Sequence, residues 1–480
     1  MRQSRRAGEH GQILVLFTLA LVALLAMLGL LFDGGNALAL RRQLQNAGDA
    51  GALAAANIVQ SLTPRGCSAT EGPPPGAPQS AIVTAARAGV RASLPWVQDS
   101  DISVTCPPGW SNYAVQVDVA ADAKTLFGRV VGITGIRAGT TSQGLNGQIS
   151  SSIYSIVVLD PSNPTWPNGR RGCPSVLISG GPTVTLEGSM VINSTCAASN
   201  GGALGTNGNS ATITLTNDAR IRIVGDFVPG PLTINPAPLV HQQPTKDPLA
   251  GLSAMPTLTT VSNSRLRLSG GSTVLNPGVY IGGIEMRNTA KAFLRPGIYV
   301  MQGGGLDIGA QNEVYSVTAG ATSTTSATWA TDCPAATCGV LIYNRAGTGS
   351  GAGAAMGQLS VGAGAAMKLR PYRPTADGSG ANQVEYENLL FWQDANPVPT
   401  SSAAQPVVQL NGGGSVDLSG TIYAPSAHVL VGGGSGGTGG ATDITLQFLV
   451  WDLTLQGNST FTFRYRSELF AKPTDYGLIK

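Results

Sequence analysis

Residues 275–293 read LNPGVYIGGIEMRNTAKAF, and the next stretch, residues 294–314, reads LRPGIYVMQGGGLDIGAQNEV. The two stretches share a proline, a glycine and a tyrosine at matching places, which are Pro277, Gly278 and Tyr280, then Pro296, Gly297 and Tyr299. A repeat of 19 residues that contains several short strands cannot bury its apolar face alone, so neighbouring repeats must stack. Stacking pairs equivalent positions such as Ile284 with Leu306 or Gly303, and it predicts a parallel, right-handed β-helix, a solenoid, over residues 173–480.

Alternating apolar and polar residues extend this β pattern over the C-terminal region. Segments 184–194, 211–227 and 415–433 alternate and end in turn residues, so each predicts strands. A β-sandwich stays an alternative because alternation alone does not distinguish the two folds. We interpret the Pro-rich stretch at about 226–262 as a loop outside the solenoid. Mobile surface loops are expected over the Ser/Thr/Ala and Gly-rich stretches at 318–336, 346–366 and 432–442.

The N-terminal region contains an uncharged run, ILVLFTLALVALLAMLGLLF, which begins at Ile13 and ends at Phe32. About 20 residues at 1.5 Å each cover the hydrocarbon core of a bilayer, so residues 13–32 predict a membrane-spanning helix. A cleaved signal peptide is the alternative, but this run exceeds the usual apolar region of about 7–15 residues. Three arginines, Arg2, Arg5 and Arg6, precede the run. The positive-inside rule therefore places the tail, 1–12, in the cytoplasm and the bulk of the chain in the periplasm or outside the cell.

Small and apolar residues continue beyond the span at helical spacing, at Leu40, Leu44, Ala47, Gly51, Ala54 and Ile58. We therefore expect the helix to continue to about Gln60. This stripe of small residues suits close packing, either against another helix or against the chain's own next domain. The two interpretations have equal weight.

The bulk composition excludes some classes of protein and favours others. A length of 480 residues predicts two or three domains. Only 11% of residues are charged, and 64 glycines and 30 prolines indicate a turn-rich chain that favours strands. The formal net charge is +3, with no basic stripe interleaved with aromatic residues, so nucleic acid is not an expected partner.

Six cysteines form three sequence-local pairs, which are Cys67 with Cys106, Cys173 with Cys196, and Cys333 with Cys338. An even number without a CxxC motif favours disulfides in an oxidising compartment over a metal site. Six cysteines permit 15 pairings, so the local pairing is only the simplest hypothesis. Some of them could instead be small buried apolar side chains.

Two segments carry a resemblance to a known family: 5–35, RRAGEHGQILVLFTLALVALLAMLGLLFDGG, and 39–57, ALRRQLQNAGDAGALAAAN. They resemble the N-terminal region of TadE/TadG-like proteins of the Flp (Tad) pilus-assembly system, in which Gly-Gln opens the span and Asp-Gly closes it. The following helix at 81–94 and the strands ending at Cys106 and starting at Ala114 continue the likeness more weakly. The resemblance implies a small α/β, pilin-like domain over 33–147, joined by a linker at 148–172 to the β-rich region.

Two departures limit the resemblance. Type IV prepilins carry a glutamate at the fifth position after the cleaved glycine, but here that position is Leu16 after Gly11, or Ile13 after Gly8. We therefore expect a permanent anchor. TadG-like chains often continue into a von Willebrand type A domain with an Asp-x-Ser-x-Ser metal loop. Here Asp160 and Ser162 are followed by Pro164 at the third ligand position, so no metal is predicted.

An enzymatic site is a relevant alternative for this region, because β-helices host many polysaccharide-cleaving enzymes. Glu285 and Asp307 would lie on neighbouring coils and could form the carboxylate pair of a glycosidase, but solvated surface charges are the commoner case. The three histidines, His10, His241 and His428, have no metal-ligand spacing. The Gly-rich run at 432–440 lacks the Gly-Lys-Ser/Thr ending of a phosphate loop. We predict no catalytic, cofactor-binding or metal-binding residues.

The sequence thus predicts a non-enzymatic component of Flp (Tad) pilus assembly or of cell-surface attachment, held in the bacterial cytoplasmic membrane by one helix. The expected partners are the lipid bilayer, other pilus-assembly or pilin-like subunits, and surface polysaccharide. Two alternatives stay open, a membrane-tethered carbohydrate-active enzyme with a β-helix groove and a surface adhesin unrelated to pili.

Overall fold

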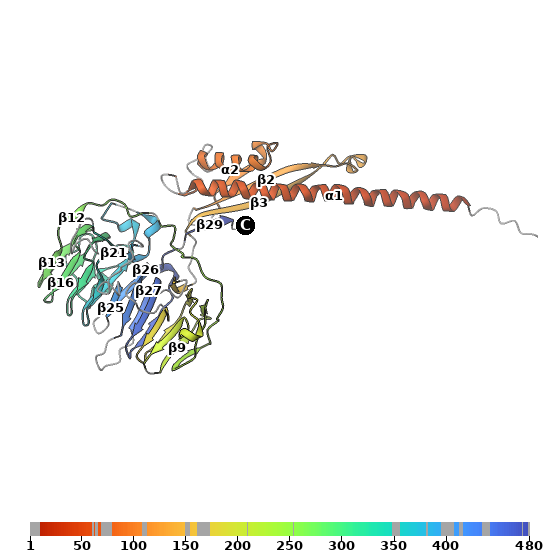
Figure 1. Ribbon diagram of the computed structural model, residues 1–480. Helices are drawn as coiled ribbons and strands as arrows, with labels where there is room; N and C mark the ends of the chain where they lie inside the picture. The colour runs from red at the N-terminus through yellow and green to blue at the C-terminus, as the bar shows by residue number, and fades with distance from the viewer. Residues whose placement is uncertain are drawn as a thin grey trace, which may run out of the picture. The chain divides into compact units, whose positions relative to one another are not determined.

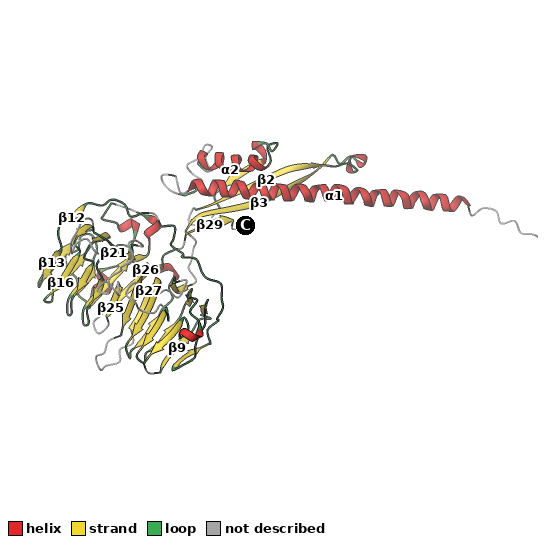
Figure 2. Cartoon of the chain, viewed as in Figure 1, coloured by secondary structure: helices red, strands yellow, loops and turns green. Residues whose placement is uncertain are grey.

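The structure is a computed structural model that forms two compact units (Figures 1 and 2). The N-terminal unit contains Met1–Ser150 and Thr474–Lys480, and the β unit contains Ser151–Pro473. The β unit is therefore an insertion between two strands of the N-terminal unit. The described residues are 10–59, 62, 66–68, 79–107, 113–148, 154–160, 173–208, 210–252, 254–347, 356–380, 383–394, 408–411, 416–433, 442–472 and 474–478.

Two helices and a four-stranded antiparallel sheet make up the N-terminal unit. The helices are α1 (His10–Val59) and α2 (Ser80–Ser93), and two short 3-10 turns, η1 (Asp99–Asp101) and η2 (Gly128–Val131), flank the strands. The sheet order is β1 (Ile102–Thr105), β2 (Ala114–Lys124), β3 (Gly135–Gln148) and β29 (Thr474–Leu478). The helix expected at 81–94 and the two strands near Cys106 and Ala114 are present. The C-terminal strand β29 completes this sheet, which the sequence did not predict.

Short parallel strands build the β unit. Its first strands are β4 (Tyr154–Val158), β5 (Val176–Ser179), β6 (Thr183–Leu186), β7 (Ser189–Ile192), β8 (Leu204–Asn207), β9 (Ala211–Leu215), β10 (Ile221–Ile223) and β11 (Leu232–Asn235). The next are β12 (Thr260–Ser262), β13 (Leu266–Ser269), β14 (Ser272–Leu275), β15 (Gly278–Ile281), β16 (Ile284–Arg287), β17 (Lys291–Leu294), β18 (Gly297–Gln302), β19 (Leu306–Ile308) and β20 (Glu313–Ser316). The last are β21 (Gly339–Arg345), β22 (Leu359–Val361), β23 (Ala366–Pro371), β24 (Leu389–Gln393), β25 (Val408–Asn411), β26 (Val416–Gly432), β27 (Thr442–Gln456) and β28 (Thr460–Phe463).

Three successive strands form one coil, and each strand pairs with its equivalent in the next coil. Thus β12, β13 and β14 pair with β15, β16 and β17, which pair in turn with β18, β19 and β20. Every pairing within the described part of the β unit is parallel, whereas a β-sandwich is built from antiparallel pairs. The all-β character predicted for this region is confirmed, while the handedness of the coils stays a prediction.

The winding order of the coils differs from their order in the chain. The last coil, β27 and β28, pairs with the first, β4, β5 and β6. The chain therefore enters the stack in its middle, winds outward to β10 and β11, crosses to the opposite end at β12, and winds back to the middle (Figure 1). In Figure 1 the blue strands β26 and β27 accordingly lie between the yellow-green β9 and the green β12.

A continuous apolar ladder shows that the two halves share one core. Its side chains are Leu268, Met286, Ile308, Val361, Leu410, Val431, Leu455 and Ile178, each in register with the next. All of them are buried. Burying each such side chain contributes roughly 1.5–3 kcal/mol, so the ladder stabilises the closed stack although its members are far apart in sequence.

The repeat period varies from coil to coil. Ile284 pairs with Leu306, one of the two partners expected for it, and Leu275 pairs with Leu294 at the predicted spacing of 19. Gly278, however, pairs with Tyr299 rather than with Gly297, because β18 begins two residues before the position that faces Gly278, although the corners after Leu275 and Leu294 both contain two residues. A shift of two residues keeps each side chain on its own face of the sheet. The rings of Tyr280 and Tyr299 therefore still stack, with centroids 6.0 Å apart.

Three sequence-based boundaries need correction. Strand β4 lies inside the expected linker, 148–172, because its apolar residues pair with both β7 and β27. The domain expected over 173–480 ends earlier, since residues 474–480 belong to the N-terminal unit. The Ser/Thr/Ala stretch at 318–336 is not simply a surface loop, because α3 (Trp329–Asp332) places the fully buried Trp329 against a small apolar cluster. Residues 1–9, 149–153, 161–172, 348–355 and 434–441, on which other expectations fell, lie outside the described residues.

The Pro-rich stretch at 226–262 packs on the stack. It contains β11, and the remainder between β11 and β12, residues 236–259, forms a strap along the coils. Asn193 exchanges two hydrogen bonds with the backbone of Thr245 at 2.7 and 2.8 Å. The hydroxyls of Tyr423 and Tyr386 donate to Asp247 at 2.7 Å and to the Ala254 carbonyl at 2.9 Å. The strap connects the two ends of the stack because the winding starts in the middle.

Candidate functional site

The first half of α1 projects beyond the rest of the N-terminal unit (Figure 2). Its large apolar side chains are exposed, including Val15, Leu16, Phe17, Leu19, Leu21, Val22, Leu24, Met27, Leu31 and Phe32. By length and composition α1 could cross a membrane, as the run from Ile13 to Phe32 predicted; a signal sequence shares these properties. A ring of exposed Leu, Val and Phe side chains is stable in lipid and unfavourable in water.

The second half of α1 packs on its own unit. Gly51 and Gly89 bring α1 and α2 together so closely that a Cβ atom on Gly89 would lie 2.8 Å from the Ala50 carbonyl oxygen. On the sheet side, Gly144 of β3 touches the Ala52 carbonyl, and the side chains of Leu44 and Ala47 are fully buried. The stripe of small residues therefore docks on the chain's own domain, which is the second of the two interpretations that the sequence left open.

Asp33, the first residue after the apolar run, holds a distant loop against α1. Its carboxylate accepts the backbone N–H groups of Leu126, Phe127 and Gly128 at 2.7, 3.1 and 2.7 Å. The ring of Phe127 stacks on Phe32 with centroids 6.2 Å apart. These amides lie at the start of η2, where unpaired N–H groups favour a negative charge. The end of the apolar run is thus fixed to the loop between β2 and β3.

The carboxylates Glu285 and Asp307 do lie side by side, in register on β16 and β19. Arginines surround them, since Arg265, Arg267 and Arg287 each approach Glu285 within 3.2 Å and Arg287 also pairs with Asp307. The hydrogen bond to Asp307 and the two negative charges raise the pKa of Arg287. A glycosidase needs one carboxyl group as the acid and one as the nucleophile or base, but here both carboxylates are engaged in ion pairs with arginines. The arrangement favours the interpretation as surface ion pairs.

Two of the three histidines pair with aspartates. His241 lies 2.8 Å from Asp226, whose pKa is lowered by the backbone N–H of Ala198 and by the histidine. His428 of β26 lies 2.8 Å from Asp452 of β27, and both are buried. The side chain of His10 lies outside the described residues. Within the described part of the chain, no group of three His, Cys, Asp or Glu side chains could hold a metal ion.

Of the three positions compared with the Asp-x-Ser-x-Ser metal loop, the structure describes only Asp160. Asp160 is buried and accepts a hydrogen bond from the Ser175 hydroxyl at 3.2 Å. Ser162 and Pro164 lie outside the described residues. Asp160 thus has a partner in the wall of the stack, which accounts for a buried carboxylate there.

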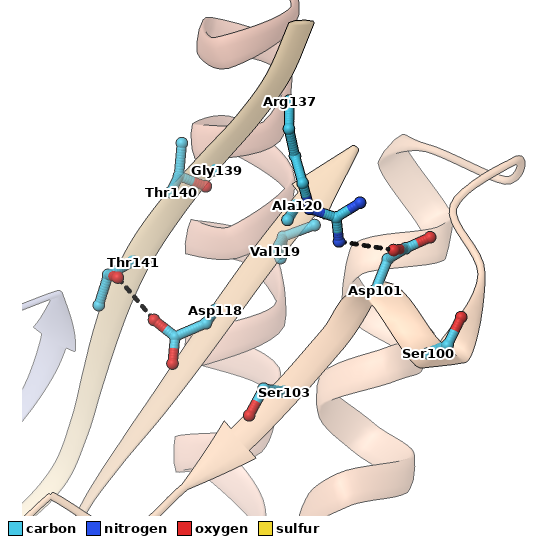
Figure 3. Close-up of a pocket in the computed structure, with 10 residues that line it drawn as sticks. All are labelled: Ser100, Asp101, Ser103, Asp118, Val119, Ala120, Arg137, Gly139, Thr140 and Thr141. Carbon is cyan, nitrogen blue, oxygen red and sulfur yellow. Dashed lines mark hydrogen bonds and ion pairs between the residues drawn. The ribbon is translucent and has the colours of Figure 1, made fainter. Parts of the chain in front are cut away.

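A surface hollow of about 340 Å³ lies on the sheet of the N-terminal unit (Figure 3). It contains two carboxylates, and both are engaged: Asp101 accepts from Arg137 at 3.1 Å, and Asp118 accepts from the Thr141 hydroxyl at 2.5 Å. The Gln116 amide also donates to Asp118 at 2.9 Å. With its charged groups paired, the hollow is a polar sheet surface and offers no unpaired acid or base for catalysis.

All three predicted cysteine pairs lie at disulfide distance. The Cα atoms are 5.6 Å apart in Cys67–Cys106, 5.8 Å in Cys173–Cys196 and 5.4 Å in Cys333–Cys338. The first pair joins a residue beyond α1 to the residue that follows β1, and the other two pairs lie in the β unit. Cysteine pairs at disulfide distance in both units are typical of proteins that fold in an oxidising compartment.

The exposed apolar helix, its packed continuation and the Asp33 contact coincide with a known family. Residues 11–57 match the family of putative Flp pilus-assembly TadE/G-like proteins. The resemblance inferred from the sequence is thereby confirmed for this segment, which contains nearly all of α1. No curated protein and no solved structure matches the chain. The family match therefore characterises the N-terminal helix, and the β unit has its own parallel-coil structure.

Sequence reasoning missed two features of this site. The partners of Asp33 lie more than ninety residues away, and nothing in the local sequence indicates them. The second feature is the apolar loop between β2 and β3, and its sequence at 125–136, TLFGRVVGITGI, was a visible signal of it, because turns between exposed strands are usually polar.

Proposed function

We propose that the chain is a non-enzymatic component of Flp (Tad) pilus assembly, anchored in the bacterial cytoplasmic membrane by residues 13–32. The observation that carries this proposal is the coincidence of the TadE/G-like match with a helix whose apolar half is exposed. In this proposal the N-terminus lies in the cytoplasm, and both units lie in the periplasm or outside the cell.

The proposed mechanism is interaction. The exposed apolar half of α1 contacts the bilayer and the helices of other pilus-assembly subunits. The β unit, which we propose to be a right-handed β-helix, presents a stiff surface, because a parallel stack with a continuous core resists bending. Surface polysaccharide is the proposed ligand class for that surface.

Membrane attachment is tested by deleting residues 1–32 and exporting the remainder with a cleavable signal. The intact chain should stay in the membrane pellet after carbonate extraction, and the truncated chain should be released. A matched control replaces 13–32 with an unrelated span of the same length, which should restore attachment. Retention of the truncated chain in membranes would contradict the single anchor.

The role in pilus assembly is tested by counting Flp pili on cells that lack the gene. The intact chain should restore the pili, whereas the form without 1–32 should not. A third form deletes Ser151–Pro473 and joins β3 to β29, which tests the β unit separately because it is an insertion. Normal pilus numbers without the gene would rule out the proposal, and cleavage of polysaccharides by the intact chain would favour the enzyme alternative.

A further inference from the structure

The loop between β2 and β3 exposes apolar side chains where a hairpin usually exposes polar ones. Leu126 is 74% exposed and Ile133 is 52% exposed. Glycines supply the turns around them, at Gly128, Gly132 and Gly135. Exposed large apolar residues gathered at one end of a unit indicate a surface that something else covers.

Hydrogen bonds fix the shape of this tip, residues 125–136. The Ile133 N–H donates to the Gly128 carbonyl at 2.8 Å, and the Thr125 hydroxyl donates to the Ile133 carbonyl. Gly132 turns the chain with a φ of 84°, in the left-handed region that favours glycine. An ordered turn therefore holds the side chains of Leu126 and Ile133 outward, so their exposure does not result from fraying of the strand ends.

The tip lies beside the last turn of the apolar run. Asp33 binds the amides of residues 126–128, and Phe127 stacks on Phe32. Farther along, the Asn36 side chain donates to the Lys124 carbonyl at 3.0 Å. Figure 1 shows the hairpin running alongside α1 within the N-terminal unit and ending partway along it. The tip thus has a fixed height on the helix.

If α1 crosses a membrane with the run 13–32, the position of the tip along α1 coincides with the edge of the bilayer. A run of about 20 residues covers the roughly 30 Å hydrocarbon core, which places its last turn where hydrocarbon meets headgroups. We propose that Leu126 and Ile133 insert into this interfacial layer and make a second membrane contact. This inference rests on the proposed membrane crossing of α1.

Two observations favour lipid over a protein partner. The tip continues the exposed apolar surface of α1 at Leu31 and Phe32, which is the surface proposed to contact lipid. Two exposed basic side chains, Lys124 and Arg129, flank the apolar ones and suit headgroup phosphates.

A helix that crosses a bilayer alone is free to rotate and slide. A second contact, held rigidly through Asp33, fixes the rotation and depth of the whole N-terminal unit.

The test uses a fluorescent label at single added cysteines of the full chain, since its own six cysteines are paired. Leu126→Cys and Ile133→Cys carry the label at the tip. Ser103→Cys is the matched control, because Ser103 is exposed and pairs with Asp118, roughly 25 Å along the sheet from Leu126 at 3.3 Å per residue. Each variant is reconstituted in phosphatidylcholine and phosphatidylglycerol vesicles, with or without brominated lipids that quench the label.

Lipid insertion should remove about half of the fluorescence at residues 126 and 133 and almost none at 103, because interfacial groups sit within about 5–10 Å of the acyl chains. Unquenched labels on a chain that floats with the vesicles would overturn the second contact and leave the anchor standing. Labels that are shielded from water but not quenched would indicate a protein partner and also overturn it. A chain that fails to float with the vesicles would contradict the proposed function itself.

Discussion

Helix α1 and the β unit solve the problem of apolar surface in opposite ways. The first half of α1 leaves its apolar side chains exposed on the outside of the protein, and in the proposed function a bilayer covers them. In the β unit, the chain brings its first and last coils together and closes the apolar ladder from Leu268 to Ile178 within itself. One contiguous run of sequence therefore specifies the exposed apolar half of α1, whereas the closed stack depends on residues almost 300 positions apart, such as Ile156 and Phe448.

The closure can be broken at its centre. Phe448 is fully buried and lies in register between Ile422 of β26 and Ile156 of β4. Phe448→Ala should lower the free energy of unfolding of the β unit by about 3–5 kcal/mol, because it leaves a cavity between the two halves of the stack. Denaturant unfolding of the full chain in detergent measures this loss.

Its control is Val261→Ala on the terminal strand β12, where the side chain is half exposed. That change should shift the unfolding free energy by less than about 0.5 kcal/mol. Equal effects from both substitutions would mean that the stack does not close through Phe448.

Each unit has its own disulfides, so their removal should affect the two units separately. Replacing Cys173 and Cys196 by alanine should destabilise the β unit by about 3 kcal/mol, because the bond closes a loop of 23 residues. Replacing Cys67 and Cys106 should instead affect the N-terminal unit, to which both cysteines belong. Thiol titration under denaturing conditions checks that the cysteines are bonded, and six reactive thiols in the unreduced protein would disprove the disulfides.

The packing of the second half of α1 on β3 can be disturbed without changing the apolar first half. Gly144→Val should destabilise the N-terminal unit by about 2 kcal/mol, because the new side chain meets the Ala52 carbonyl. Gly139→Val on the same strand is the matched control, since a Cβ there lies 3.7 Å from Ala120 Cβ. Thermal unfolding compares the two, and an equal loss in both would contradict the close contact between α1 and β3.

The smallest expected effect concerns the strap. Burial raises the pKa of Asp247 above its ordinary value, although the hydroxyl of Tyr423 and the N–H of Leu249 oppose this. A carboxyl with a raised pKa favours the folded state when protonated, and this contribution is lost as pH rises through its folded pKa. Hydrogen exchange of the strap should therefore quicken, after correction for intrinsic rates, as pH rises through that value. In Asp247→Asn this dependence should vanish, and a dependence that persists would exclude Asp247 as its cause.

Local sequence predicted the features whose cause is local. The apolar run from Ile13, the helical spacing through Leu44, and the pairing of Leu275 with Leu294 all follow from composition and periodicity. The register of Gly278 with Tyr299 did not follow, because a strand can begin two residues earlier without changing the face of any side chain.

Long-range features were beyond the sequence patterns. The meeting of β27 with β4 and the return of β29 to the first sheet join segments with no shared motif. The contact between Asp33 and the amides of residues 126–128 is of the same kind, since any buried N–H group can satisfy a carboxylate. Such features depend on tertiary packing, which a single sequence does not encode in any local period.

The central claim, that the first half of α1 lies in a bilayer and its second half does not, is tested most directly by thiol accessibility. Leu19→Cys and Leu38→Cys form a matched pair, because both leucines are 63% exposed in the protein alone. In intact vesicles that contain the full chain, a water-soluble maleimide should label residue 38 and leave residue 19 unlabelled until detergent is added. Equal labelling of both residues in intact vesicles would contradict the account.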